Sequence, residues 1–231
     1  MNRTLNVIRM QLVNRQTYLW VPVIVLGGAF AITLAIYGII ASAGVEGPMY
    51  GGGAQAPLWY FAVVGAQALT LTFPFSQAMS VTRREFHIGT HLTAALTAAL
   101  LALIFAVGGL VEQATSGWGM NGYFFYIPWV SDGGPAAAWL FFFSLAMLFF
   151  VFGYWGATIF KRFGTAVLTA VLLGIALILV GLLWLVGRLE AWAQVGAWLG
   201  AQGSLGLTLW GLLLIAVLIA SSYLTLRRAV P

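Results

Sequence analysis

The chain has 231 residues, of which 62% are hydrophobic and only 6% are charged, with a formal net charge of +5. Soluble domains carry charge on about 25% of their residues, so this composition, with a mean hydropathy of +0.99, predicts an integral membrane protein. The basic residues are scattered in ones and twos without a basic face, which argues against nucleic-acid binding. The absence of cysteine excludes disulfides, iron–sulfur clusters and thiol catalysis.

The N-terminal part of the chain combines arginines with regularly spaced apolar residues. Over residues 1–17 the apolar positions lie three and four apart, which predicts an amphipathic helix on the membrane surface. A basic tail that only sets orientation is the alternative. Residues 18–42 are the first predicted span, because about 20 apolar residues cross a core of about 30 Å. Gly27, Ala31 and Ala35 recur every four residues in this span, a stripe that lets another helix approach closely.

The second predicted span, residues 58–81, is unusual in its polar residues. Pro74 is expected to kink the helix. Gln67, Thr70 and Gln77 follow helical spacing and share one face. Because polar groups that face lipid are costly, this face is expected to look at a cavity or at another helix. Hydrogen bonding between helices, with no role in transport, is the alternative.

The charged stretch after the second span contains its own helix start and stop signals. Thr82 followed three residues later by Glu85 is the pattern of a capping box, which predicts a helix that begins at Arg83. Gly89 is suited to end this helix, and Thr90 to cap the next one. We therefore expect a separate helix of about two turns, which is too short to be stable alone and must rest on lipid headgroups or another protein.

The remaining predicted spans are residues 91–111, 136–160, 165–187 and 206–226. Between them lie a loop rich in glycine and aromatic residues at 112–135, which is expected to fold into the headgroup region, and a tight turn at Phe163 and Gly164. Residues 188–205 are too polar and too short for a full crossing. They predict a helix at the outer surface or one that re-enters the membrane.

The distribution of charge supports a count of six spans. With the N-terminus inside, every basic residue except Arg188 falls on the inner side, as the positive-inside rule requires. The expected outer acids are Glu46, Glu112, Asp132 and Glu190. The expected fold class is therefore an all-α membrane protein with six transmembrane helices and both termini cytoplasmic. The preference for arginine over lysine, with abundant Ala and Gly, is typical of GC-rich bacterial genomes and suggests the cell membrane of a prokaryote.

The chain lacks the sequence patterns that are typical of ion-coupled transport, metal binding and catalysis. No ionisable residue is expected deep in a span, whereas ion-coupled carriers usually keep one there. His87 and His91 are four residues apart with Gly89 between them, and we expect them to be solvated at headgroup level rather than to bind a metal. There is no catalytic constellation, no metal site and no phosphate-binding loop, so the chain is not expected to be an enzyme.

The charged stretch resembles the short cytoplasmic coupling helix between spans two and three of ABC-2 type transporter permeases. The family pattern is a hydrophobic residue, Ser or Thr, two arginines, any residue, an aromatic residue, any two residues, then Gly and Thr. The chain has Val81-Thr82-Arg83-Arg84-Glu85-Phe86-His87-Ile88-Gly89-Thr90. The basic helix before span one, the Lys-Arg turn after span four and the outer helix between spans five and six extend the resemblance to most of the chain.

The resemblance implies a transporter subunit. In that family two permease chains pair as a homodimer or a paralogous heterodimer, and each docks a separate ATPase through the N-terminal helix and the coupling helix. ATP and Mg²⁺ bind the ATPase, and this chain needs no cofactor of its own. The residues implied to couple to the ATPase are Thr82, Arg83, Arg84, Glu85, Phe86 and His87. Those implied to face the translocation path are Gln67, Thr70, Gln77 and Thr169.

Two other functions remain open from the residues alone. One is a membrane anchor or regulatory protein that transports nothing, and the other is a passive channel or carrier. The polarity of the path favours amphipathic drugs, peptides or lipid-linked molecules as cargo, and the short outer loops argue against a folded protein. The sequence leaves open the substrate itself and the choice between export and import.

Overall fold

The structure is a computed structural model that describes residues 3–45 and 47–227. Residues 1 and 2 of the expected N-terminal helix, Glu46 and Arg228 lie outside the described residues. The chain is built from α1 (Arg3–Val13), α2 (Val21–Ser42), α3 (Ala56–Gln67), α4 (Phe73–Ala78), α5 (Arg83–Ala114), α6 (Pro128–Ser131), α7 (Pro135–Arg188) and α8 (Trp192–Leu226). Shorter turns are η1 (Gln16–Trp20), η2 (Gly52–Gln55), η3 (Ala68–Thr72) and η4 (Gly117–Asn121), and two short strands, β1 (Met49–Tyr50) and β2 (Gly122–Tyr123), pair in parallel.

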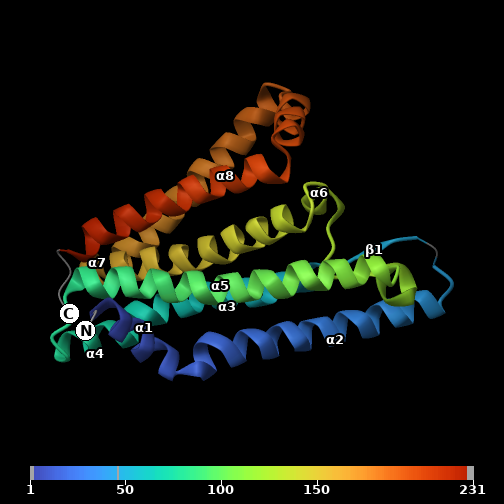
Figure 1. Ribbon diagram of the computed structural model, residues 1–231. Coiled ribbons are helices and arrows are strands. Elements are labelled where there is room, and N and C mark those ends of the chain that lie inside the picture. The colour runs from blue at the N-terminus through green and yellow to red at the C-terminus, as the bar shows by residue number, and fades with distance from the viewer. Residues whose placement is uncertain (1–2, 46, 228–231) are drawn as a thin grey trace.

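The long helices make this an all-α membrane protein, as the composition predicts. Within the described residues, five helical segments are long and apolar enough to cross a membrane: Gln16–Ser42, Gly52–Ala78, Arg83–Ala114, Pro135–Arg188 and Trp192–Leu226. Helices α3, α5 and the first half of α7 pack side by side. Helix α1 and the end of α8 lie at the same end of the bundle (Figure 1).

Two of these long helices are broken at glycines. In α7, Gly164 has φ 82° and ψ 179°, a conformation that side chains other than glycine rarely adopt. The chain reverses direction there, so α7 consists of a first arm (135–163) and a second arm (165–188) (Figure 1). This confirms the turn expected at Phe163 and Gly164. In α8, Gly203 (φ 61°) separates a short arm from a long arm, so residues 192–202 form a helix within the expected range 188–205.

The second expected span is interrupted near Pro74. The segment Ala68–Thr72 is π-helical and leads directly into α4. Because Pro74 has no N–H to donate to the carbonyl of Thr70, the regular bonding pattern fails at this turn. The helical structure also ends at Ala78, earlier than the expected boundary at residue 81.

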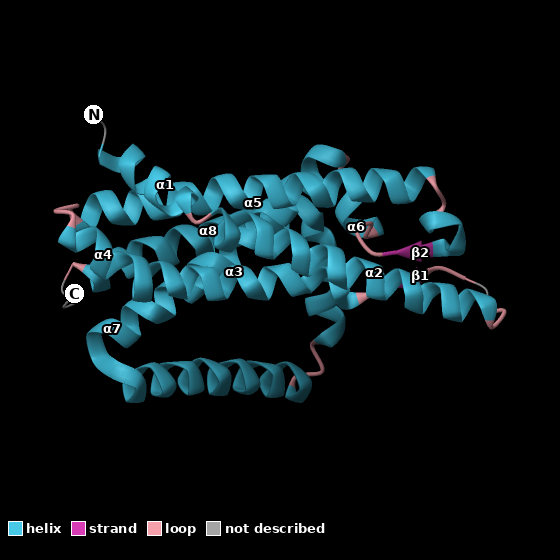
Figure 2. Cartoon of the chain, turned by 90° about the horizontal axis from the view of Figure 1, so that it is seen from below, coloured by secondary structure: helices cyan, strands magenta, loops and turns pink. Residues whose placement is uncertain are grey.

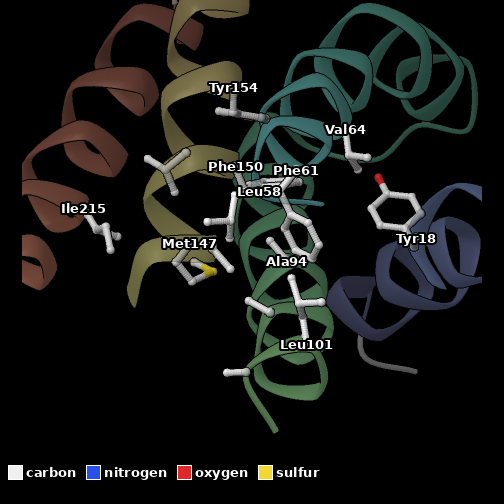
Figure 3. Packing of buried hydrophobic residues seen from close by; sticks show 14 of the residues in the cluster. Tyr18, Leu58, Phe61, Val64, Ala94, Leu101, Met147, Phe150, Tyr154 and Ile215 are labelled. Carbon is white, nitrogen blue, oxygen red and sulfur yellow. The ribbon is translucent and has the colours of Figure 1, made fainter. Parts of the chain in front are cut away.

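The core lies where α3, α5 and the first arm of α7 meet (Figure 3). Gly65 of α3 lies against the carbonyl group of Phe150, and Gly153 of α7 lies against the carbonyl group of Ala62. A Cβ atom at either glycine would overlap the opposite backbone. The two glycines therefore let the helices cross in backbone contact, as small residues do in membrane proteins.

The second arm of α7 has few partners within the chain. Four consecutive side chains, from Leu177 to Val180, are each more than half exposed, so every side of the helix is uncovered at this level. Figure 2 shows this arm standing apart from the other helices. In a membrane such a surface is covered by lipid or by another chain.

Candidate functional site

The candidate site is the end of the bundle that carries most of the positive charge, which we call the basic end. It is formed by α1, the start of α5, the Gly164 turn of α7 and the end of α8 (Figure 1). The basic residues on or next to these elements include Arg9, Arg15, Arg83, Arg84, Lys161, Arg162 and Arg227.

The start of α5 is fixed by the capping box that the sequence predicts. The Thr82 backbone N–H donates to Glu85 Oε2 at 3.0 Å, and the Glu85 backbone N–H donates to Thr82 Oγ1 at 3.2 Å. These bonds satisfy two of the free backbone donors at this helix end. The helix begins at Arg83, as expected.

The expectation of a separate two-turn helix is wrong. The segment from Arg83 continues without a break to Ala114, and Gly89 lies inside this single helix. Gly89 is needed for close packing instead of helix termination, because a Cβ atom there would meet the Val7 side chain at 2.7 Å. The charged stretch is therefore the first part of the long helix α5.

Helix α1 is attached to this first part of α5. Val7, which is 1% exposed, packs against Gly89. Four residues further along α1, the Gln11 amide donates from Nε2 to Thr90 Oγ1 at 2.7 Å, and both side chains are buried. A displacement of α1 must therefore move the start of α5 with it. The helix expected over residues 1–17 is present from Arg3 to Val13, and it rests on α5.

Arg83 connects the start of α5 to the end of α8. Its Nη1 atom donates to the carbonyl oxygens of Leu226 at 3.3 Å and Arg227 at 2.7 Å. Carbonyl groups at the end of a helix lack partners within the helix, and a cation there also complements the helix dipole. The basic end is thus linked across α1, α5 and α8.

The coupling residues implied by the resemblance are not equally accessible. Thr82 and Arg84 are exposed, while Arg83 and Glu85 are half-buried. Phe86 is 0% exposed and packs on Phe73, with the ring centroids 5.2 Å apart. An ATPase that docks on this surface would therefore meet Arg84, whereas Phe86 supports the helix from within.

The two histidines lie in the interior, and the expectation that they are solvated at headgroup level is wrong. His87 and His91 are buried, and their ring centroids are 4.3 Å apart. His91 Nδ1 lies 2.8 Å from the His87 carbonyl oxygen, and His87 Nδ1 lies 3.4 Å from the Tyr154 hydroxyl. Both Nε2 atoms are buried without a hydrogen-bond partner. Among the described residues, no group of three or more potential metal ligands is brought together.

The residues implied to face a path lie on two separate parts of the molecule. Gln67, Thr70 and Gln77 are half-buried along the segment from α3 to α4. The Thr70 hydroxyl donates to the Ala66 carbonyl at 3.0 Å, and the Gln77 amide donates to the Val81 carbonyl at 3.0 Å. Thr169 is exposed on the second arm of α7, the arm that stands apart from the other helices (Figure 2). Thr169 therefore lies on a different helix from the other three side chains.

Glu112 organises the opposite end of α5, a role that no sequence pattern indicated. Instead of lying in a loop, it is the third residue from the end of this helix, and it is 0% exposed. Its carboxylate accepts hydrogen bonds from the backbone N–H groups of Phe124 (3.0 Å), Phe125 (2.8 Å) and Tyr126 (2.7 Å) and from the Trp118 indole N–H (2.8 Å). One buried carboxylate therefore holds the aromatic loop against the helix.

No protein-family model matches the chain, and no significant match was found among curated proteins or solved structures.

Proposed function

We propose that this chain is the membrane-spanning subunit of an ATP-driven ABC exporter in the cell membrane of a prokaryote, and that the basic end docks a separate ATPase. The observation that carries this proposal is the α1–α5 joint, where Val7 packs on Gly89 and Gln11 donates to Thr90. Arg84 is exposed beside this joint. ATP and Mg²⁺ would bind the partner. This chain would hold no cofactor and catalyse no reaction itself.

In this proposal the chain crosses the membrane six times, because each arm of α7 makes its own crossing. Both termini are then cytoplasmic. Arg84, Arg162 and Arg227 lie on the inner side, and Arg188 lies on the outer side, in agreement with the positive-inside rule. The same assignment puts the Glu112 carboxylate and the aromatic loop at the outer side.

The long helix α5 supports a lever mechanism. Its 32 residues extend for about 48 Å at a rise of about 1.5 Å per residue. One end is joined to α1 and the other to the aromatic loop through Glu112. When the partner ATPases close on ATP, a push on the α1–α5 joint would be carried along this helix to the outer loop. Nucleotide binding on the inner side would thereby change the structure at the outer side.

The path would form between two copies of the permease. The exposed second arm of α7 offers the surface for pairing, and pairing would bring Thr169 closer to the polar face that includes Gln67, Thr70 and Gln77. A path with amide and hydroxyl groups between apolar walls suits amphipathic cargo better than small ions.

We expect an ATPase to co-purify with the wild-type chain from its native membrane. Replacing Arg84 by glutamate should lower the recovery of the ATPase about tenfold, because a partner surface that pairs with an arginine would repel a carboxylate. Arg188 lies at the end of the second arm of α7, far along the chain from the Gly164 turn, and serves as the control. Arg188→Glu should leave the recovery of the ATPase unchanged. Quantitative mass spectrometry of the purified complex measures both. A chain that purifies without any ATPase would indicate an anchor or regulator, and transport or current without ATP would indicate a passive carrier.

A further inference from the structure

A cavity of about 410 Å³ opens at the basic end, where the Gly164 turn of α7 meets the last turn of α8. It is lined by Arg162, Leu224, Thr225 and Arg227. Neither the α1–α5 joint nor the residues implied to line a path contribute to this cavity. It is therefore a part of the basic end that is separate from the α1–α5 joint.

The two arginines that line the cavity come from α7 and the end of α8, and neither has an acidic partner among residues 3–45 and 47–227. In the described part of the chain, neither guanidinium group forms an ion pair, and no carboxylate lines the cavity. The guanidinium carbon of Arg162 lies 4.5 Å from the centre of the Phe163 ring, and that of Arg227 lies 6.0 Å from the Tyr223 ring. Two such groups on one cavity favour an anion with several oxygens, such as a phosphate group.

The backbone at one side of the cavity is already held in place. Because Arg83 donates to the carbonyl oxygens of Leu226 and Arg227, the last turn of α8 is attached to α5. The Arg227 side chain therefore extends from a fixed backbone, so less chain entropy is lost when it binds a ligand. The same bonds neutralise the negative end of the α8 dipole, which would otherwise repel an anion.

The surface next to the arginines is apolar and exposed. Leu224, which lines the cavity, is 61% exposed, and Phe163, whose ring lies beside the Arg162 guanidinium, is 49% exposed. A free phosphate ion gains nothing from such a surface. A phospholipid places its phosphate at the level of the arginines and its acyl chains beside the apolar side chains.

We propose that this cavity binds the headgroup of an anionic phospholipid. The lipid phosphate would accept hydrogen bonds from Arg162 and Arg227, and an acyl chain would lie along Leu224. The bound lipid would hold the Gly164 turn against α8 and so steady the second arm of α7, which has few other contacts. This inference does not depend on the proposed transport function.

Native mass spectrometry of the purified full-length chain, with phosphatidylglycerol or phosphatidylcholine added in detergent, tests this proposal. We expect wild-type protein to retain phosphatidylglycerol and not phosphatidylcholine. Arg162→Gln and Arg227→Gln should each weaken retention about fivefold, and the double variant should weaken it further. Arg15→Gln removes the same charge from an exposed position on the same end and should leave retention unchanged. Arg227→Lys, which keeps the charge, should retain lipid better than Arg227→Gln.

Three outcomes would overturn the proposal. Equal losses in Arg15→Gln and Arg162→Gln would show that general charge alone attracts the lipid. Equal retention of phosphatidylcholine would show that the arginines select nothing. Displacement of phosphatidylglycerol by millimolar inorganic phosphate would identify a site for free phosphate. A thermal melt of each variant keeps misfolding separate from loss of lipid.

Discussion

Replacing Glu112 by alanine is expected to lower the free energy of unfolding by roughly 4 kcal/mol or more, since it leaves four N–H donors without their acceptor in a buried site. Glu112→Gln keeps one acceptor oxygen but loses the charge and the second oxygen. We expect it to lower the free energy of unfolding by about half as much as Glu112→Ala. Chemical or thermal unfolding in detergent, followed by tryptophan fluorescence, measures the change. Trp118 reports directly on the loop, because its indole N–H is one of the four donors.

The control for Glu112 is another acid of the same region. Asp132 is exposed, and Asp132→Asn should change the free energy of unfolding by no more than about 0.5 kcal/mol. If Glu112→Ala unfolds like Asp132→Asn, the carboxylate does not hold the loop, and the proposed lever has no attachment at this end of α5.

The second large effect is expected at the crossing of α3 and α7. Gly153→Ala places a Cβ atom against the Ala62 carbonyl group and must push the two helices apart, which is expected to cost about 3 kcal/mol. Thermal unfolding in detergent measures this loss. Gly174 lies on the second arm of the same helix with no atom within 4 Å of an added Cβ.

Gly174→Ala is therefore the matched control. The same substitution in the same helix should leave the free energy of unfolding unchanged or raise it slightly, because alanine favours helix formation by about 1 kcal/mol over glycine. Equal losses at positions 153 and 174 would mean that a general effect of glycine, and not the backbone contact, determines the cost.

The sequence was sufficient for the features that depend on neighbouring residues. The capping box at Thr82 and Glu85 satisfies the free backbone donors of its own turn, and Gly164 takes a conformation that few other residues allow, so both could be predicted locally. Apolar length alone likewise predicted helices long enough to span a membrane.

The features that the sequence did not predict depend on contacts with distant parts of the chain. Gly89 ends a helix in many sequences, but here it is packed under Val7 of α1, which sequence spacing cannot show. The stripe of Gly27, Ala31 and Ala35 is exposed in this chain, so the close approach expected there stays a prediction. Gly65 and Gly153, which do permit a close approach, lie on helices far apart in the sequence.

Burial of polar groups was also beyond the reach of sequence patterns. Glu112 follows an apolar run, as many solvated loop residues do, and only the return of the aromatic loop brings three backbone N–H groups to its carboxylate. His87 is buried because Tyr154 and Tyr223, from two later helices, pack over it.

The proposed function requires the surface around Arg84 to dock an ATPase. A photo-crosslinking amino acid placed at position 84, and for comparison at Trp192 on α8, can be activated in the native membrane and its adducts identified by mass spectrometry. We predict that position 84 is linked to a subunit with a nucleotide-binding phosphate loop and that position 192 is not. Adducts with lipid alone at position 84 would contradict the proposed function.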